Sequence, residues 1–189
     1  MKSRYLIALS LMFLPALALA SCGGGGASPS TGSEKPSIHF TSRGLSPKKV
    51  ISASYHCDPK KNWLPLSWGP VPNGTKELAL YMVRFGVPKV TKGGVVKAEI
   101  KAESIVVGLS PGLRSLSPGR FPGGARIGVH RINGKPISIC PAPGRTESML
   151  FRLYALPRRL GFNRSSNLVG AMGKEALEAG TFIASYRSA

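Results

Sequence analysis

The sequence predicts a mainly β protein, with a single domain built as an antiparallel sandwich or barrel-like sheet and one helix near its C-terminus. Three observations support this: short β-branched or aromatic runs recur along the chain, turn residues separate them, and long runs of helix-forming residues are scarce. Of the 189 residues, 42% are hydrophobic, which is enough to build a core and argues against wholesale disorder.

The expected strands are short and begin at residue 37. Residues 78–83 form a near-continuous apolar run, as expected of a strand buried on both faces, whereas residues 95–100 alternate around Lys97 and Glu99. Other strand-like runs lie at residues 37–41, 50–55, 104–109, 125–132, 136–139 and 150–156. Turns rich in Gly, Pro and Asn separate them, at residues 72–74, 92–94, 117–119, 122–124 and 133–134.

The predicted helix precedes the last strand. Ser165 or Ser166 can cap its first turn, and Gly180 offers a stop at its end. The apolar positions 168, 172, 176 and 179 fall on one face, and residues 181–186 then close the chain as a strand.

The N-terminus predicts export, because residues 1–21 have the pattern of a lipoprotein signal peptide. Lys2 and Arg4 precede an apolar stretch that is short for a membrane span of about 20 residues. The stretch ends in Leu-Ala-Ser followed by Cys22, which resembles the lipobox of bacterial lipoproteins, where the Cys receives a diacylglyceryl group and becomes the new N-terminus. The alternative is an ordinary signal peptide with a chance Cys.

Residues 22–36 follow as a lipidated Cys and a Gly/Ser-rich tether, whose composition cannot bury apolar surface. The folded domain is expected to span residues 37–189. This organisation predicts a protein anchored to the bacterial cell membrane and facing outside the cytoplasm.

The charge is strongly basic, with 26 Lys and Arg against 8 Asp and Glu and a formal net charge of +18. Loss of Lys2 and Arg4 with the signal lowers it to +16. Such a surface favours anionic partners, here anionic lipid or wall polymer near the membrane. No recognised nucleic-acid motif is present, so no specific nucleic-acid partner is expected.

Two cysteines remain in the domain, Cys57 and Cys140. An oxidising compartment permits a disulfide between them. Two buried thiols, or a metal site with His56, His130 and Asp58, are the alternatives. No Cys-x-x-Cys or His-x-x-x-His spacing supports a metal, so neither a metal nor another cofactor is expected.

Four short motifs follow one another along the domain. They read Tyr-His-Cys-Asp at residues 55–58, Leu-Pro-Leu-Ser-Trp at 64–68, Cys-Pro-Ala-Pro-Gly at 140–144 and Phe-Arg-Leu-Tyr-Ala-Leu at 151–156, before the closing helix and strand. In this order they resemble the bacterial branch of the phosphatidylethanolamine-binding protein family. The resemblance implies a large antiparallel central sheet packed on a smaller sheet, with peripheral helices. It also implies that Cys57 and Cys140 border one pocket and reach each other.

The family's anion pocket is largely replaced here. Its Asp-Pro-Asp-Ala-Pro turn aligns with residues 84–88, from Arg84 to Pro88, and its His-Trp pair with Glu103 and the residue after it. Its His-Arg-Tyr segment begins at Glu147, and its Cys-Pro-Pro-x-Gly loop contributes Pro141. These five residues are the candidate ligand pocket.

The substitutions partly invert the polarity of that pocket. Glu103 and Glu147 would repel phosphate, and Arg84 is expected to pair with one or both, because an unpaired buried charge is very costly. The pocket is then either plugged by an ion pair or suited to a cationic group. The alternative is a shifted register, with all three residues solvated on the surface.

No catalytic residues are expected. His56 adjoins Cys57, yet neighbouring residues of a strand point to opposite faces. We expect an exported, membrane-anchored ligand-binding lipoprotein with a degenerate anion pocket and an unknown ligand. The alternative is a non-catalytic protein-interaction or inhibitor module with a closed pocket.

Overall fold

A computed structural model describes most of the predicted domain. The described residues are 37–58, 60–61, 63–87, 89–90, 92, 94, 96–128, 137–140, 143–161 and 168–187, and they belong to one compact unit. The predicted signal peptide, Cys22 and the tether lie outside them, as do Pro88, His130, Pro141, Ser165 and Ser166.

The described strands form a larger five-stranded antiparallel sheet and a smaller three-stranded one. The large sheet has the order β10 (Glu178–Arg187), β9 (Thr146–Leu156), β3 (Glu77–Gly86), β6 (Ile100–Leu109) and β8 (Arg126–Gly128). The small sheet has the order β1 (Phe40–Ser42), β2 (Leu66–Trp68) and β7 (Ser115–Leu116). The predicted fold class, mainly β with a large and a small sheet, is confirmed.

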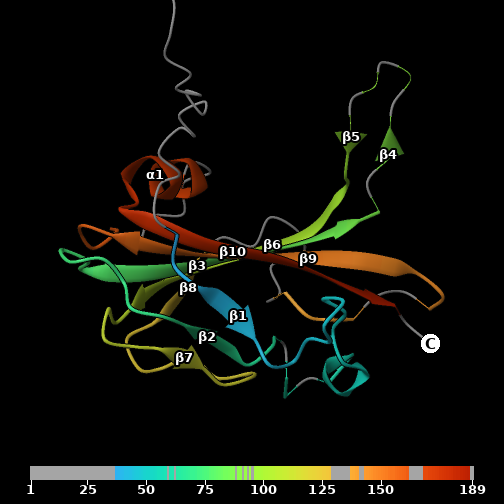
Figure 1. Cartoon of the computed structure of the whole chain (residues 1–189), viewed down its shortest axis with the longest axis horizontal. Coiled ribbons are helices and arrows are strands. Elements are labelled where there is room, and N and C mark those ends of the chain that lie inside the picture. Colours follow the sequence, from blue (N-terminus) through green and yellow to red (C-terminus); the bar gives the residue numbers. More distant parts are fainter. Residues whose placement is uncertain are drawn as a thin grey trace, which may run out of the picture. The chain divides into compact units, whose positions relative to one another are not determined.

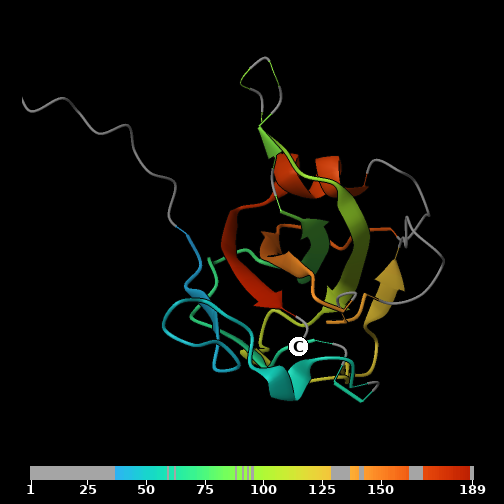
Figure 2. The same cartoon turned by 90° about the vertical axis from the view of Figure 1, so that its right-hand side faces the viewer.

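Three layers result. The small sheet covers one face of the large sheet, and helix α1 (Leu168–Glu175) covers the other (Figure 1 and Figure 2). A two-stranded hairpin, β4 (Lys89–Val90) and β5 (Val96–Lys97), continues from β3 and β6 beyond the sheet. Within the described residues, no helix is long and apolar enough to cross a membrane.

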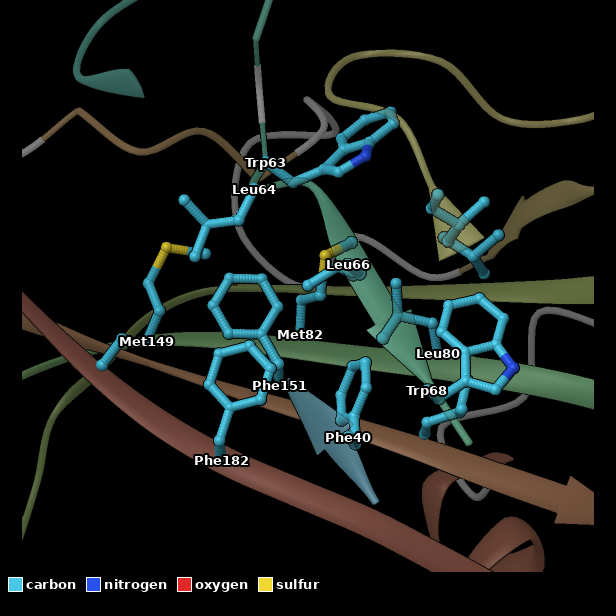
Figure 3. Packing of buried hydrophobic residues seen from close by; sticks show 14 of the residues in the cluster. Phe40, Trp63, Leu64, Leu66, Trp68, Leu80, Met82, Met149, Phe151 and Phe182 are labelled. Carbon is cyan, nitrogen blue, oxygen red and sulfur yellow. The ribbon is translucent and has the colours of Figure 1, made fainter. Parts of the chain in front are cut away.

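The main core lies between the two sheets. Because side chains alternate across a strand, the even-numbered residues of β3, such as Leu80 and Met82, face the small sheet. Aromatic rings fill the layer (Figure 3): the ring of Phe182 lies 5.0 Å from that of Phe40 and 4.9 Å from that of Phe151, between centroids. This face of β3 ends in Arg84, which follows Met82 in the same alternation.

A smaller apolar cluster lies under the helix. Leu168 and Met172 of α1 pack there against Ala79 of β3 and Ile105 of β6, with Tyr154 of β9. The central strands are therefore apolar on both faces, which explains the near-continuous apolar run at residues 78–83.

Several expected elements differ in the structure. Of the strand expected at residues 136–139, the described residues 137–139 form no strand. Residues 50–55 form isolated bridges at Val50 and Ile51, followed by the 3-10 helix η1 (Ala53–Tyr55), because the amide of Tyr55 donates locally to the carbonyl of Ser52. The helix ends at Glu175 rather than at Gly180. Gly180 lies inside β10, where a Cβ would collide with the Ile38 carbonyl oxygen and lie 2.6 Å from the Cβ of Phe40.

Candidate functional site

The candidate site lies at the end of the core where β3 finishes. Arg84 on β3, Glu147 on β9 and Tyr186 on β10 share the face that looks toward the small sheet. The strand register brings them together, since Glu147 is opposite Gly86 on one side and Tyr186 on the other. Three neighbouring strands therefore place a cation, a carboxylate and a phenol at one point.

Arg84 is charge-compensated within the protein. Its Nε lies 3.6 Å from Oε2 of Glu147, and its Nη1 donates to the carbonyl oxygens of Cys140, at 3.0 Å, and Ser138, at 3.4 Å. Glu147 is buried, and its side chain is 9% exposed against 21% for that of Arg84. The predicted pairing of Arg84 with a glutamate therefore occurs, with Glu147.

The carbonyl groups that Arg84 contacts belong to a segment held by a disulfide. Cys57 and Cys140 are bonded, with their Cα atoms 4.5 Å apart, inside the range that a disulfide requires. The amide of Cys57 also donates to the carbonyl of Ile139 at 2.8 Å. The pairing of these two cysteines is confirmed, and it leaves neither with a free thiol.

Tyr186 completes the cluster as a hydrogen-bond donor. Its hydroxyl donates to Oε2 of Glu147 at 3.0 Å. Burial of the phenol raises the pKa of Tyr186 strongly, and the adjacent Glu147 carboxylate raises it further, while the positive charge of Arg84 opposes this. The hydroxyl therefore keeps its proton at neutral pH and remains a donor.

Two buried polar atoms at the site lack a hydrogen-bond partner among the described residues. One is Nε of Arg84, whose contact with Glu147 is an ion pair beyond hydrogen-bond distance. The other is Nε2 of His56, whose ring lies 5.7 Å from the ring of Tyr186, between centroids. Buried polar atoms are nearly always satisfied, so these two are exceptions in this part of the core.

No protein-family model and no curated protein matches this sequence. Among solved structures, the chain is similar to a phosphatidylethanolamine-binding protein homologue from Chlamydia trachomatis, with a TM-score of 0.62 and 25% identity over 81% of this chain and 99% of that one. It is also similar to YbcL of Escherichia coli, described as a new member of the mammalian phosphatidylethanolamine-binding protein family. That match has a TM-score of 0.60 and 19% identity, and it covers 82% of this chain and 100% of YbcL. The chain has the phosphatidylethanolamine-binding protein fold.

Within this fold, Glu103 does not join Arg84 and Glu147. The register pairs it with Val83, and Arg84 with Ala102, so Glu103 points to the helix-covered face of the sheet. There its buried Oε2 accepts a hydrogen bond from the hydroxyl of Tyr81 at 3.1 Å. The structure thus separates the two glutamates that were expected to share a pocket.

The residue after Glu103 occupies the site face instead. Ser104 is opposite Met82, and its Oγ accepts a hydrogen bond from the amide of Ile137 at 3.1 Å. Glu103 therefore lies one position along β6 from Ser104, the residue that points to the face carrying Arg84 in this fold. Because side chains alternate, that single step moves a carboxylate across the sheet.

Sequence reasoning did not assign Tyr186 or His56 to the site. A signal for Tyr186 was present, because the strand expected at residues 181–186 ends in this tyrosine. His56 lies beside the disulfide-bonded Cys57, and its ring lies 5.7 Å from the ring of Tyr186, between centroids. Among the described residues, no group of three or more His, Cys, Asp or Glu side chains is arranged to hold a metal ion.

Proposed function

We propose that this protein is a non-catalytic ligand-binding protein with the phosphatidylethanolamine-binding protein fold, exported and held at the membrane by a lipid on Cys22. The fold supports a binding role, and the N-terminal sequence supports the anchor. The single observation that carries the proposal is the cluster of Arg84, Glu147 and Tyr186, which combines neutralised charge with unsatisfied polar atoms at one buried place.

The cluster favours a ligand with polar atoms and little net charge. The Arg84 guanidinium already faces the Glu147 carboxylate and two carbonyl oxygens, so an anion would have to displace them and approach a buried acid. A hydrogen-bonding group without charge meets Nε of Arg84 and Nε2 of His56 at no such cost. The degenerate anion pocket therefore becomes a site for an uncharged polar group.

We propose that the protein has no catalytic activity because its two domain cysteines are joined in a disulfide. A nucleophilic thiol beside His56 would be the simplest catalytic arrangement that the sequence offers. Cys57 instead forms the disulfide with Cys140 and has no free thiol to act as a nucleophile. The described site holds a fixed ion pair and a protonated phenol, which suit positioning of a ligand.

Native mass spectrometry of the protein purified from the cell envelope tests ligand binding at the cluster. We expect the folded chain to carry a small molecule that is lost in His56→Leu and retained in Lys48→Gln, an exposed control outside the site. Failure to find a bound compound, or its retention in His56→Leu, would contradict the proposal.

The anchor is tested separately through Cys22. The native chain should partition into the detergent phase and show the added mass of a diacylglyceryl group at its N-terminus, whereas Cys22→Ser should remain in the aqueous phase. An unmodified native chain in the aqueous phase would remove the lipid anchor from the proposal without affecting the binding site.

One observation favours a second candidate, a protein-interaction or inhibitor module with a closed pocket. Nη1 of Arg84 is shared between the carbonyl oxygens of Ser138 and Cys140, so the ion pair also ties the disulfide-held segment over the site. This candidate predicts no bound small molecule. It also predicts that loss of the Arg84 contacts, in Arg84→Met, weakens a partner complex by loosening that segment.

A further inference from the structure

A second concavity lies at the opposite end of β3 from the candidate site. Its volume is about 350 Å³, within the usual size of small-ligand pockets, and its lining includes Lys76, Glu77, Ser110, Arg126 and Arg159. Glu77 begins β3 and Arg84 lies seven residues along it, so roughly 23 Å of strand separates the two places. We call this concavity the basic cavity, and we infer that it binds a phosphate group. The inference does not depend on the proposed function.

Three cations from three separate segments converge on the basic cavity, and each is placed by the backbone. The amide of Lys76 donates to the carbonyl of Leu156 at 2.8 Å, immediately before β3. Arg126 begins β8 and is paired with Val107 of β6. Arg159 follows β9 and precedes Leu160, which is buried in the core under the helix.

The charges of Lys76 and Arg159 are not cancelled within the cavity. Among its described lining residues, Glu77 is the only acid, so these two cations exceed it by one formal charge. Glu77 is 3% exposed, and its Oε1 accepts a hydrogen bond from the amide of Leu160 at 3.4 Å. The carboxylate therefore serves to hold the Arg159 segment against the start of β3, while the three cations are exposed. A concave surface with charge of one sign concentrates oppositely charged ligands.

The floor is open because glycines form it. Gly108 has a φ of +78°, and a Cβ there would lie 2.7 Å from the carbonyl oxygen of Gly124, so only glycine lets β6 approach the turn at residues 122–125. A Cβ on Gly123 or Gly124 would meet nothing within 4 Å, which shows free space above that turn. Ser110 lines the same space, and its Oγ accepts the Gly112 amide at 3.3 Å, so its proton remains able to donate.

These donors match phosphate better than other anions. Guanidinium groups present paired N–H donors that fit two oxygens of a phosphate, and a lysine adds a point charge. Arg159, Lys76 and the hydroxyl of Ser110 line one space and can together contact several oxygens of a tetrahedral group. A soluble phosphoester and a phospholipid head group present this chemistry equally, so the two sources are separated by experiment.

The full chain carrying Cys22→Ser, purified from an oxidising compartment, is the protein for the test. Calorimetric titration with sn-glycerol 3-phosphate should show binding that weakens about tenfold in Arg159→Gln and further in Lys76→Gln/Arg159→Gln. Lys48→Gln removes one equally exposed cation outside the cavity and should leave the affinity unchanged. These residues are exposed, so circular dichroism should show the same melting curve for every variant.

A second arm uses vesicles of phosphatidylcholine with or without phosphatidylglycerol. Binding of both glycerol phosphate and anionic vesicles, each reduced by the double substitution, supports the phosphate site for either source. Response to vesicles alone, lost in the double variant, supports a lipid head group, and response to glycerol phosphate alone supports a soluble phosphoester. Binding to neither probe, or equal loss in Lys48→Gln and Arg159→Gln, would overturn the inference.

Discussion

The two ends of β3 hold the same kind of cation in opposite electrostatic states. At one end, Arg84 is largely covered and its charge meets Glu147 and two backbone carbonyl oxygens. At the other end, Lys76 and Arg159 are exposed, and the one acid among the described residues that line their cavity is Glu77, which is buried. The positive charge at the Arg84 end is balanced by the protein itself, and the positive charge at the other end is left for an anionic ligand.

A basic residue therefore indicates an anion site only when its surroundings leave its charge uncancelled. Position in the fold alone would favour the Arg84 end, because the resemblance places the family's pocket there. The contacts favour the basic cavity for anions and leave the Arg84 end for an uncharged polar group. Four sets of substitutions test this contrast, and they follow in order of decreasing expected loss of stability.

Removal of the disulfide should have the largest effect and should act at the Arg84 end. Cys57→Ala/Cys140→Ala opens a cross-link between residues 83 positions apart, and we expect the free energy of unfolding to fall by about 2–4 kcal/mol. Urea denaturation measures this. Binding of glycerol phosphate should persist in the variant while it is folded, because the basic cavity is built from other segments. A loss below about 0.5 kcal/mol would show that the cross-link contributes little to stability.

Glu147→Gln should destabilise the protein by about 1–3 kcal/mol, since it leaves the Arg84 charge without its carboxylate. This expected loss of stability is smaller than the loss for a fully buried ion pair because the Arg84 side chain is 21% exposed. Arg159→Gln at the other end is the matched control and should change stability by less than about 0.5 kcal/mol. Equal losses in the two variants, measured by thermal unfolding, would erase the contrast.

High pH should weaken the Arg84 end through Tyr186. Its pKa is raised in the folded protein, so the unfolded chain loses the phenol proton first and folding stability falls as the pH rises above about 10. Tyr186→Phe should be less stable than the native chain at pH 7, and the gap should narrow at pH 11. Urea midpoints at both pH values measure it. A gap that widens with pH would contradict the assignment.

The smallest effect is expected at an exposed ion pair next to the basic cavity. Nη2 of Arg158 lies 2.6 Å from Oε1 of Glu175, and their side chains are 60% and 31% exposed. Glu175→Gln should therefore cost less than about 1 kcal/mol, and less still in high salt. Denaturation at low and high salt checks this, and a cost equal to that of Glu147→Gln would show that burial does not set the difference.

Sequence patterns predicted the fold well where they are local. The apolar run of β3 and the turns around it indicated a buried central strand, and the order of short motifs indicated the two-sheet fold and the Cys57–Cys140 pairing. The predicted strand at residues 50–55 was wrong because local hydrogen bonds form η1 instead.

The candidate site was harder to predict, because the side of a strand depends on single-residue register. Glu103 lies one step from the face that carries Arg84, and only the pairing of β3 with β6 shows this. The basic cavity had no sequence signal, since Lys76, Arg126 and Arg159 are brought together by tertiary contacts alone. Tyr186 was visible as the end of the last strand, but its bond to Glu147 was not.

One titration reads both ends of β3 at once. Inorganic phosphate is added to the isotope-labelled chain carrying Cys22→Ser, and nuclear magnetic resonance follows the Arg84 Nε–H signal together with the amides of Gly123, Gly124 and Arg126. We predict that the three amides shift with saturation while the Arg84 signal does not move, and that Glu147→Gln makes Arg84 respond. A saturating shift of the Arg84 Nε–H signal in the native chain, without a shift of the three amides at the basic cavity, would contradict the assignment of the phosphate site to that cavity.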